Sequence, residues 1–186
     1  MKGDLRALDV RNKKVIVRVD FNVPLSKDFQ VTDDTRLRGA LPTIEYLVEK
    51  GAKIILVSHF ARPLAKLLPD GEIDRNKFSL RHVVPALSAL LGKEVAFFPD
   101  CVGEAVLQKT NELGSGDILL LENTRFHAGE EKGDPAMAAQ LASLGDIYIN
   151  DAFGAAHRAH ASTTVVANHF DAAHKAFGYL MQLELD

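Results

Sequence analysis

The sequence predicts an α/β protein with a doubly wound, mainly parallel sheet and helices on both faces, the three-layer arrangement of Rossmann-like folds. Short apolar runs rich in β-branched residues alternate along the chain with segments whose apolar residues recur at helical spacing. Polar or charged residues follow most of the apolar runs directly, and in open α/β sheets ligands bind at this end of the strands. A chain of 186 residues is long enough for one sizeable core and short for two.

Five segments have the composition of buried parallel strands. They are short, rich in Val, Ile and Leu, and bounded by turn residues, and they cover residues 15–19, 53–57, 95–98, 117–121 and 147–149. Pro24 follows the first of them. Because proline lacks an amide N–H, we expect regular pairing to stop before it.

Helices are expected in the intervals between these strands. Four helices are predicted, and a glycine ends each of them. They run from Asp34 to Gly51, from Ser79 to Gly92, from about Gly103 to Gly114, and from Asp134 to Gly145. Pro42 lies inside the first helix, where it should kink or locally break it. Residues 64–77 have little periodicity and predict a surface loop, and residues 161–186 predict a helical start followed by irregular chain.

Composition and charge exclude several classes of protein. Hydrophobic residues make up 47% and charged residues 25%, as in ordinary globular domains, and we find no apolar run long enough to span a membrane and no signal-peptide pattern. The single cysteine, Cys101, rules out an internal disulfide, and a cytoplasmic location is expected. The net charge of −3 argues against nucleic-acid binding.

Four of the predicted strands end in polar side chains that a parallel sheet would bring to one edge. These are Asp20 and Asn22, His59 and Arg62, Arg125, and finally Asn150, Asp151 and Arg158. Arg36 would join them from the start of the first helix. Several guanidinium groups around one site suit a small ligand with a phosphate and a carboxylate, because each group can bind an oxyanion bidentately. The carboxylate and amide of the first strand end could bind a hydroxyl of the same ligand.

Structural roles compete with these functional ones. A single arginine at a strand end is more often the partner of a nearby carboxylate, and Arg18, in mid-strand, is expected to form an internal ion pair. Cys101 is expected to be a small core or surface residue rather than a nucleophile. His157 and His160 could share a helical face as metal ligands, but no third ligand joins them, so no metal is expected. Residues 130–132 are expected to be a solvated loop.

Nucleotide-binding motifs are missing. The sequence has no Gly-x-x-x-x-Gly-Lys-Ser/Thr loop, and Gly114-Ser115-Gly116 does not continue into a dinucleotide-binding fingerprint. The residues therefore suggest the part of a protein that binds a small anionic ligand, without the part that would bind a phosphoryl donor.

Four motifs together resemble the phosphoglycerate kinase family of the bacterial type. They are Val17-Arg18-Val19-Asp20-Phe21-Asn22-Val23-Pro24, Ser58-His59-Phe60-Ala61-Arg62-Pro63, Glu122-Asn123-Thr124-Arg125-Phe126 and Asn150-Asp151-Ala152-Phe153-Gly154-Ala155-Ala156-His157-Arg158-Ala159-His160. They occur in the family's order and span nearly the whole chain. The resemblance implies transfer of a phosphoryl group between 1,3-bisphosphoglycerate and ADP, giving 3-phosphoglycerate and ATP with Mg²⁺.

The resemblance also implies roles for individual residues. Arg62, Arg125 and Arg158 would bind the substrate phosphate, and Asp20, Asn22, Arg36 and His59 would bind its carboxyl and hydroxyl end. Arg36 would in addition act catalytically by stabilising charge on the transferred phosphoryl group. Phe21, Phe60 and Ala61 lie within the same motifs and are included in the substrate-binding set. Phe60-Ala61 replaces the family's usual Leu-Gly, and because alanine is strained at positive φ, we expect the backbone of this loop to differ.

The family's organisation implies that residues 1–171 form the phosphoglycerate-binding N-terminal domain and residues 172–186 begin the connection to a C-terminal nucleotide-binding domain that this chain lacks. We therefore expect a monomer that binds 3-phosphoglycerate or 1,3-bisphosphoglycerate, with Mg-ATP or Mg-ADP bound only in the complete enzyme and no activity without the second domain. Two rival hypotheses are a stand-alone anion-binding or regulatory module and a purely structural domain. The retained arginines argue against the second, because an uncovered cationic pocket is unfavourable without an anion.

Overall fold

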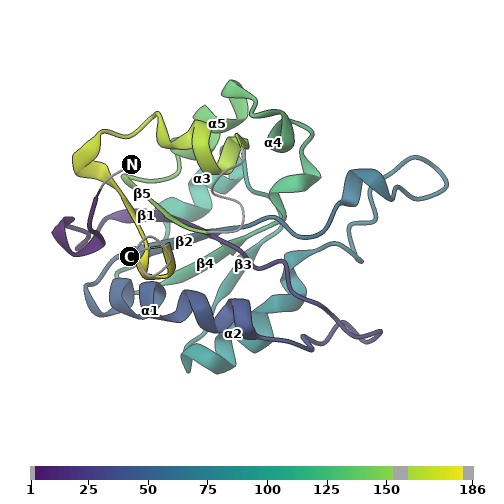
Figure 1. Cartoon of the computed structure of the whole chain (residues 1–186), viewed down its shortest axis with the longest axis horizontal. Helices are drawn as coiled ribbons and strands as arrows, with labels where there is room; N and C mark the ends of the chain where they lie inside the picture. Colours follow the sequence, from purple (N-terminus) through teal and green to yellow (C-terminus); the bar gives the residue numbers. More distant parts are fainter. Residues whose placement is uncertain (1–2, 153–158, 182–186) are drawn as a thin grey trace.

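Six short strands form one sheet in the computed structural model, which describes residues 3–152 and 159–181. They are β1 (Lys14–Val19), β2 (Lys53–Val57), β3 (Ala96–Phe98), β4 (Ile118–Leu121), β5 (Ile147–Asp151) and β6 (Lys175–Phe177). Their order across the sheet is β3-β4-β2-β1-β5-β6, and every pairing of neighbours is parallel. The predicted α/β architecture is confirmed, and β1 and β2 lie at its centre (Figure 1).

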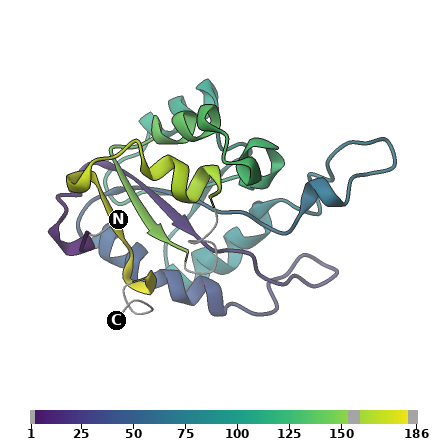
Figure 2. The same ribbon diagram turned by 45° about the horizontal axis from the view of Figure 1, so that its top comes forward.

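Helices cover both faces of the sheet. On one side lie α1 (Thr35–Glu49) and α2 (Val84–Leu91); on the other lie α3 (Glu104–Asn111), the short α4 (Gly129–Lys132) and α5 (Pro135–Ala142) (Figures 1 and 2). Successive side chains of a strand point to opposite faces. Accordingly, Val15 and Val17 of β1 pack in the core beneath α1, whereas Ile16 packs in the core that α5 covers.

Pro42 does not break the first helix. The helix continues through it from Thr35 to Glu49, so the predicted local break is absent. Proline removes the hydrogen bond to the carbonyl of Arg38, and both residues are exposed, so that carbonyl can turn toward water. As predicted, a glycine follows the end of the helix: Gly51 lies just after the last residue that caps it and has a φ of 75°.

The second predicted helix begins with a tighter turn. Residues Leu80–Val83 form a 3-10 turn, which α2 continues, and the Ser79 hydroxyl accepts the amide N–H of Arg81 at its start. Pro85 lies at the start of α2, where a missing N–H costs least. The helix ends as predicted at Gly92, which has a left-handed φ of 62°.

The sixth strand is a correction to the predicted five. β6 has three residues and pairs with β5, with Tyr148 opposite Lys175 and Asn150 opposite Phe177. It lies beyond residue 171, so the described part of the segment 172–186 contributes to the sheet.

The predicted surface loop over 64–77 is confirmed. It projects from the body of the molecule beyond a short 3-10 turn, Pro63–Ala65, and exposes Leu64, Leu67 and Leu68 (Figure 1). None of the helices in the described part of the chain is both long and apolar enough to cross a membrane.

Candidate anion-binding site

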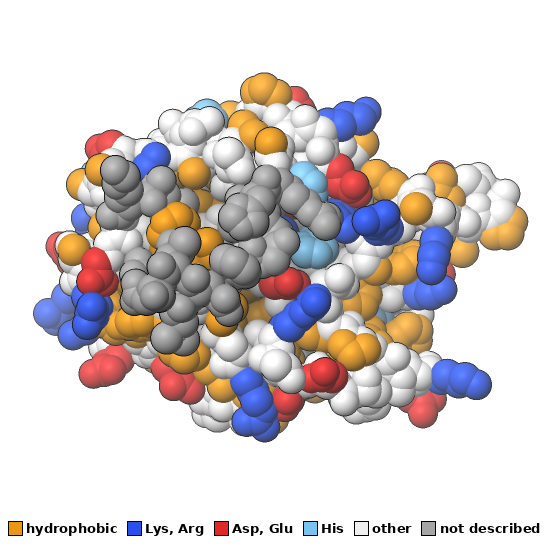
Figure 3. Space-filling model, in the orientation of Figure 1, with side chains coloured by type: hydrophobic (Ala, Val, Ile, Leu, Met, Phe, Trp, Pro, Cys, Tyr) orange, Lys and Arg blue, Asp and Glu red, His pale blue; other side chains and the backbone are white. Residues whose placement is uncertain are grey.

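The carboxyl ends of β1, β2, β4 and β5 meet at one edge of the sheet, which we call the carboxyl edge. The register brings Arg18 of β1 opposite Val57 of β2 and Asn150 of β5, so the segments that follow these strands begin side by side. On the face shown in Figure 3, His and Lys/Arg side chains gather near the middle with acidic side chains beside them. Cationic groups are therefore interspersed with carboxylates and do not form a uniform patch.

The segment after β1 is held in a tight turn that Arg36 joins. The Asp20 carboxylate accepts the amide N–H of Asn22 at 3.0 Å, and Arg36 Nη1 lies 3.4 Å from the same Asp20 oxygen. The same nitrogen donates to the backbone carbonyl of Asn22. The Arg36 side chain is 51% exposed, so its guanidinium is fixed on one side and faces solvent on the other. The predicted approach of Arg36 to this strand end is confirmed.

The segment after β2 is bound to the segment after β1. The Ser58 hydroxyl accepts the amide N–H of Phe21 at 2.9 Å, and the side-chain oxygen of Asn22 accepts the amide N–H of Ala61 at 2.9 Å. Ala61 has a φ of 54°, in the left-handed region. The alanine therefore has the positive φ at which it is strained, and the hydrogen bonds on both sides of the residue hold it there.

Arg125 is buried at the carboxyl edge and 4% of its surface is exposed. Its Nη1 donates to the backbone carbonyl of Ala61 at 3.0 Å, and its Nε lies 3.8 Å from a carboxylate oxygen of Glu131. The guanidinium thus reaches the loop that carries Arg62, which is itself exposed.

Asn123 connects these loops, and the sequence analysis did not assign it to the site. Its side-chain oxygen accepts the amide N–H groups of Phe60 and Arg125, at 2.9 and 3.0 Å, and its amide group donates to the carbonyls of Phe60 and Phe78. The signal in the sequence was an asparagine two residues beyond the end of a buried strand, because such a side chain can replace missing backbone partners.

The two predicted phenylalanines have their side chains in the core. Phe21 is fully buried and 6% of Phe60 is exposed, and both pack in the cluster beneath α1. Their structural effect is to anchor the two loops, since each loop begins with a side chain fixed in the interior.

A buried polar network lies beneath His59. Arg18 is fully buried; its Nη2 lies 2.9 Å from His59 Nδ1, and its Nε donates to the Ser162 hydroxyl at 2.8 Å. Because a guanidinium can only donate, His59 Nδ1 is the acceptor and the ring proton is on Nε2. The Ser162 hydroxyl in turn donates to Glu130 at 2.5 Å.

This network corrects two expectations. Arg18 forms no direct ion pair among the described residues; the Ser162 hydroxyl separates it from the nearest carboxylate in this network, that of Glu130. Residues 129–132 form α4 rather than a solvated loop, and Glu130 is fully buried, where it also accepts the amide N–H of Ser162 at 2.8 Å.

The structure describes only part of the last group of predicted site residues, the one that follows β5. Arg158 and His157 lie outside the described residues. His160 is buried, and burial lowers the pKa of its imidazole. Asn150 and Asp151 have structural partners: the Asn150 side chain accepts the amide N–H of Ala152, and Asp151 accepts those of Leu180 and Met181.

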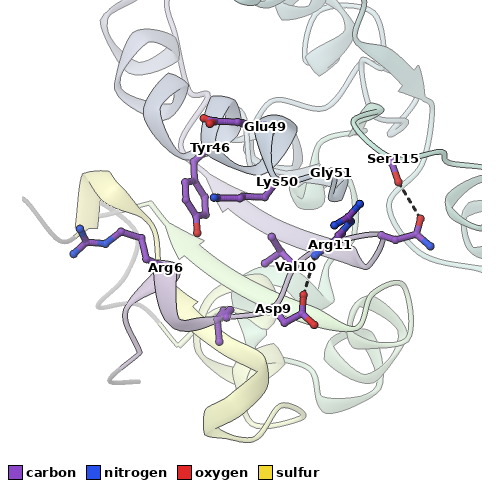
Figure 4. Close-up of a pocket in the computed structure, with 11 residues that line it drawn as sticks. Arg6, Asp9, Val10, Arg11, Tyr46, Glu49, Lys50, Gly51 and Ser115 are labelled. Carbon is purple, nitrogen blue, oxygen red and sulfur yellow. Dashed lines mark hydrogen bonds between the residues drawn. The ribbon is translucent and has the colours of Figure 1, made fainter.

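A large cavity lies at the opposite edge of the sheet, away from the arginines predicted to bind the ligand. It has a volume of about 910 Å³, and residues that precede β1, β2 and β4 line it, including Arg11, Lys50 and Ser115 (Figure 4). Basic and acidic side chains share its wall, since Asp9 and Glu49 also line it. Its position at the amino ends of the strands separates it from the carboxyl edge.

Open parallel α/β sheets place ligands at the carboxyl ends of their strands, and guanidinium groups such as those at this edge are suited to oxyanions. The sequence model of the family "Phosphoglycerate kinase" matches residues 5–186. The chain belongs to the phosphoglycerate kinase family.

Individual relatives agree with this assignment. The chain is 50% identical to a phosphoglycerate kinase of Thermosynechococcus vestitus over 184 residues, and 52% identical to a cytosolic phosphoglycerate kinase of Triticum aestivum over 184 residues. These alignments cover 99% of this chain and 44% and 43% of the relatives. Crystal structures of phosphoglycerate kinases show the same fold: that of Pyrococcus horikoshii OT3 superposes with a TM-score of 0.83 at 32% identity, covering 100% of this chain and 44% of the other. The chain therefore spans less than half the length of the relatives it matches.

Proposed function

We propose that this chain is the N-terminal, phosphoglycerate-binding half of a phosphoglycerate kinase. It would bind 3-phosphoglycerate or 1,3-bisphosphoglycerate for phosphoryl transfer to and from ADP and ATP in glycolysis. The observation that carries the proposal is the convergence of Arg36 and Arg125, from elements far apart in sequence, on the loops after β1 and β2. Membership of the family supports the choice of ligand.

Each group at the carboxyl edge has a proposed role. Arg62, Arg125 and Arg158 bind the phosphate, because a guanidinium matches two phosphate oxygens at once. Asp20, Asn22, Arg36 and His59 hold the carboxyl and hydroxyl end of the ligand.

Arg36 has the catalytic role. Its guanidinium is tied to Asp20 on one side and exposed on the other, so it can contact charge that develops on the transferred phosphoryl group. Phosphoryl transfer depends mainly on positioning and charge stabilisation, so this site needs no nucleophile of its own.

The nucleotide and its Mg²⁺ are substrates that we place on the second domain of the complete enzyme. The described carboxyl edge offers arginine, amide and imidazole groups for an anion, and the sequence contains no phosphate-binding glycine loop. We propose that residues 1–171 form the substrate domain, that residues 172–186 lead toward the nucleotide domain, and that the complete protein works as a cytoplasmic monomer.

Calorimetric titration with 3-phosphoglycerate tests the role of Arg36 against a matched control. Arg38 lies on the same helix, is 62% exposed and is paired with Asp34, but has no contact with Asp20 or Asn22. Arg36→Gln should weaken binding by about 10- to 100-fold, because a charge-assisted hydrogen bond is lost. Arg38→Gln should leave the affinity unchanged. Equal affinities for wild type and Arg36→Gln would contradict the assignment.

A coupled assay of phosphoryl transfer tests the other half of the proposal. With ATP, Mg²⁺ and 3-phosphoglycerate, the chain alone should give no turnover above buffer, while a full-length relative gives measurable turnover in the same assay. Turnover by the chain alone would show that it carries its own nucleotide site.

A further inference from the structure

Three metal-binding side chains converge at the ends of β3 and β4, outside the proposed phosphoglycerate site. Asp100 and Cys101 follow β3, and His127 follows the 3-10 turn Thr124–Phe126 after β4. One ligand atom from each, a carboxylate oxygen, the thiol sulfur and an imidazole nitrogen, all lie within 4.8 Å of one another. The two strands are neighbours in the sheet, with Phe98 opposite Leu121, so the fold itself brings the three together.

Hydrogen bonds hold the cluster in place. His127 Nε2 lies 2.8 Å from Asp100 Oδ1, and the same oxygen accepts the amide N–H of Cys101 at 2.7 Å. The ring and the carboxylate are partly exposed, 36% and 46% respectively, whereas the cysteine is fully buried. The cluster therefore has its sulfur at the bottom and opens to solvent on the side of the nitrogen and oxygen.

The charge around the cluster favours a cation. The carboxylates of Asp100, Glu122 and Glu130 all lie near the Cys101 thiol.

We propose that Asp100, Cys101 and His127 form a binding site for a borderline divalent cation, with Zn²⁺ as the ion that the donors fit best. Zn²⁺ takes sulfur, imidazole nitrogen and carboxylate oxygen together, whereas Mg²⁺ prefers oxygen ligands only. Three protein ligands leave the fourth tetrahedral position to water on the exposed side. The bound ion would tie the end of β3 to the segment that carries Arg125.

Binding has a defined proton balance. The Cys101 thiol loses its proton to solvent when the Zn–S bond forms. The neutral imidazole binds through Nε2, so its ring proton moves to Nδ1, and Asp100 exchanges its hydrogen bond for a bond to the metal. One proton is released for each ion bound.

Titration of the untagged, chelator-treated chain with Zn²⁺ and with Co²⁺ tests the proposal. Calorimetry should give one Zn²⁺ per chain, and the Co²⁺ complex should show a thiolate-to-cobalt charge-transfer band in the near ultraviolet. His127→Ala should weaken Zn²⁺ binding by more than about 100-fold, because loss of a direct ligand should exceed the effect of losing an outer partner. Cys101→Ser should abolish the charge-transfer band.

A second His–Asp pair provides the matched control. His174 Nδ1 lies 2.5 Å from Asp171, on the exposed surface and outside any thiol-containing cluster of the described residues. His174→Ala should bind Zn²⁺ as the wild type does. The partly exposed His127→Ala keeps the test valid if Cys101→Ser fails to fold, as judged by circular dichroism. Unchanged Zn²⁺ affinity in His127→Ala, no Zn²⁺ binding by the wild type, or a Co²⁺ complex without the band would each overturn the proposal.

Discussion

Ala61 lies at the point where three segments of the carboxyl edge meet. Its amide N–H donates to the Asn22 side chain, and its carbonyl accepts from Arg125, while its φ of 54° is one that alanine adopts only at a cost. These contacts with Asn22 and Arg125 favour the left-handed conformation. The residue is therefore a point of local strain within the proposed binding site.

Replacing Ala61 with glycine should relieve this strain. The left-handed conformation costs alanine about 1–2 kcal/mol, and the greater freedom of glycine in the unfolded chain offsets part of the gain. We expect Ala61→Gly to raise the free energy of unfolding in urea by about 0.5–1 kcal/mol. Ala128→Gly is the control: Ala128 is exposed with a φ of −59°, so this change should be destabilising. A lower free energy of unfolding for Ala61→Gly than for the wild type would contradict the claim that Ala61 is strained.

Asp151 should make the stability depend on pH. Desolvation by burial raises the pKa of this carboxyl from 3.8 to about 6, although the amide N–H groups of Leu180 and Met181 and the Thr43 side chain act in the opposite direction. Because the folded state holds the proton more tightly than the unfolded state, the contribution of Asp151 to stability is greatest below pH 4. It is lost as the pH rises through about 6, by up to about 3 kcal/mol.

Urea unfolding of wild type and Asp151→Asn between pH 4 and pH 7 measures this contribution. The asparagine side chain does not titrate, and its oxygen can accept the hydrogen bonds that Asp151 Oδ1 accepts. The wild type should therefore lose stability relative to the variant as the pH rises. Parallel stability curves for the two proteins would show that Asp151 titrates at the same pH folded and unfolded.

At the scale of elements, the sequence predicts those helices and strands that a local pattern of residues determines. The apolar residues of 53–57 predict β2 with its observed bounds, and the Asp134–Pro135 pair predicts α5, whose start Asp134 caps through the amide N–H of Ala136. β6 was missed because three residues, Lys175–Phe177, carry no periodicity and depend on pairing with β5.

The burial of Glu130 was missed for a related reason. The run Glu130-Glu131-Lys132 has the composition of a solvated surface. Its first residue is buried because Ser162, which is 32 residues away in sequence, donates two hydrogen bonds to it. A contact of this kind depends on the tertiary fold and has no local signal.

The Ser162 hydroxyl connects β1, α4 and the π-helical turn Ala161–Val165, and its removal should destabilise all three. Ser162→Ala leaves the buried Arg18 and Glu130 each without one hydrogen-bond partner, which should cost about 1–3 kcal/mol in the free energy of unfolding. Ser143 is an exposed serine whose hydroxyl donates to the carbonyl of Gln140, and Ser143→Ala should change stability by less than about 0.5 kcal/mol. Similar losses in urea for both variants would mean that the bridge through Ser162 contributes little.

At the scale of the whole molecule, two parts of the surface compete as anion sites. At the carboxyl edge, Arg36 from the first turn of α1 and Arg125 donate hydrogen bonds to the loops after β1 and β2, whereas the cavity at the amino ends has Arg11 and Lys50 in its wall. The sequence predicted the first, because the order of strands in a parallel fold brings strand ends together. It could not predict Asn123 as the link between loops, because that role depends on where Phe60 and Phe78 lie in the fold.

The most direct test of the proposed site is to follow backbone amide NMR signals of the chain during titration with 3-phosphoglycerate. We predict shifts at the carboxyl edge, in residues 20–22, 36, 59–62 and 125, and none among the residues that line the cavity of Figure 4. Shifts confined to Arg11, Lys50 and Gly51, or no shifts at millimolar ligand, would contradict a phosphoglycerate site at the carboxyl edge.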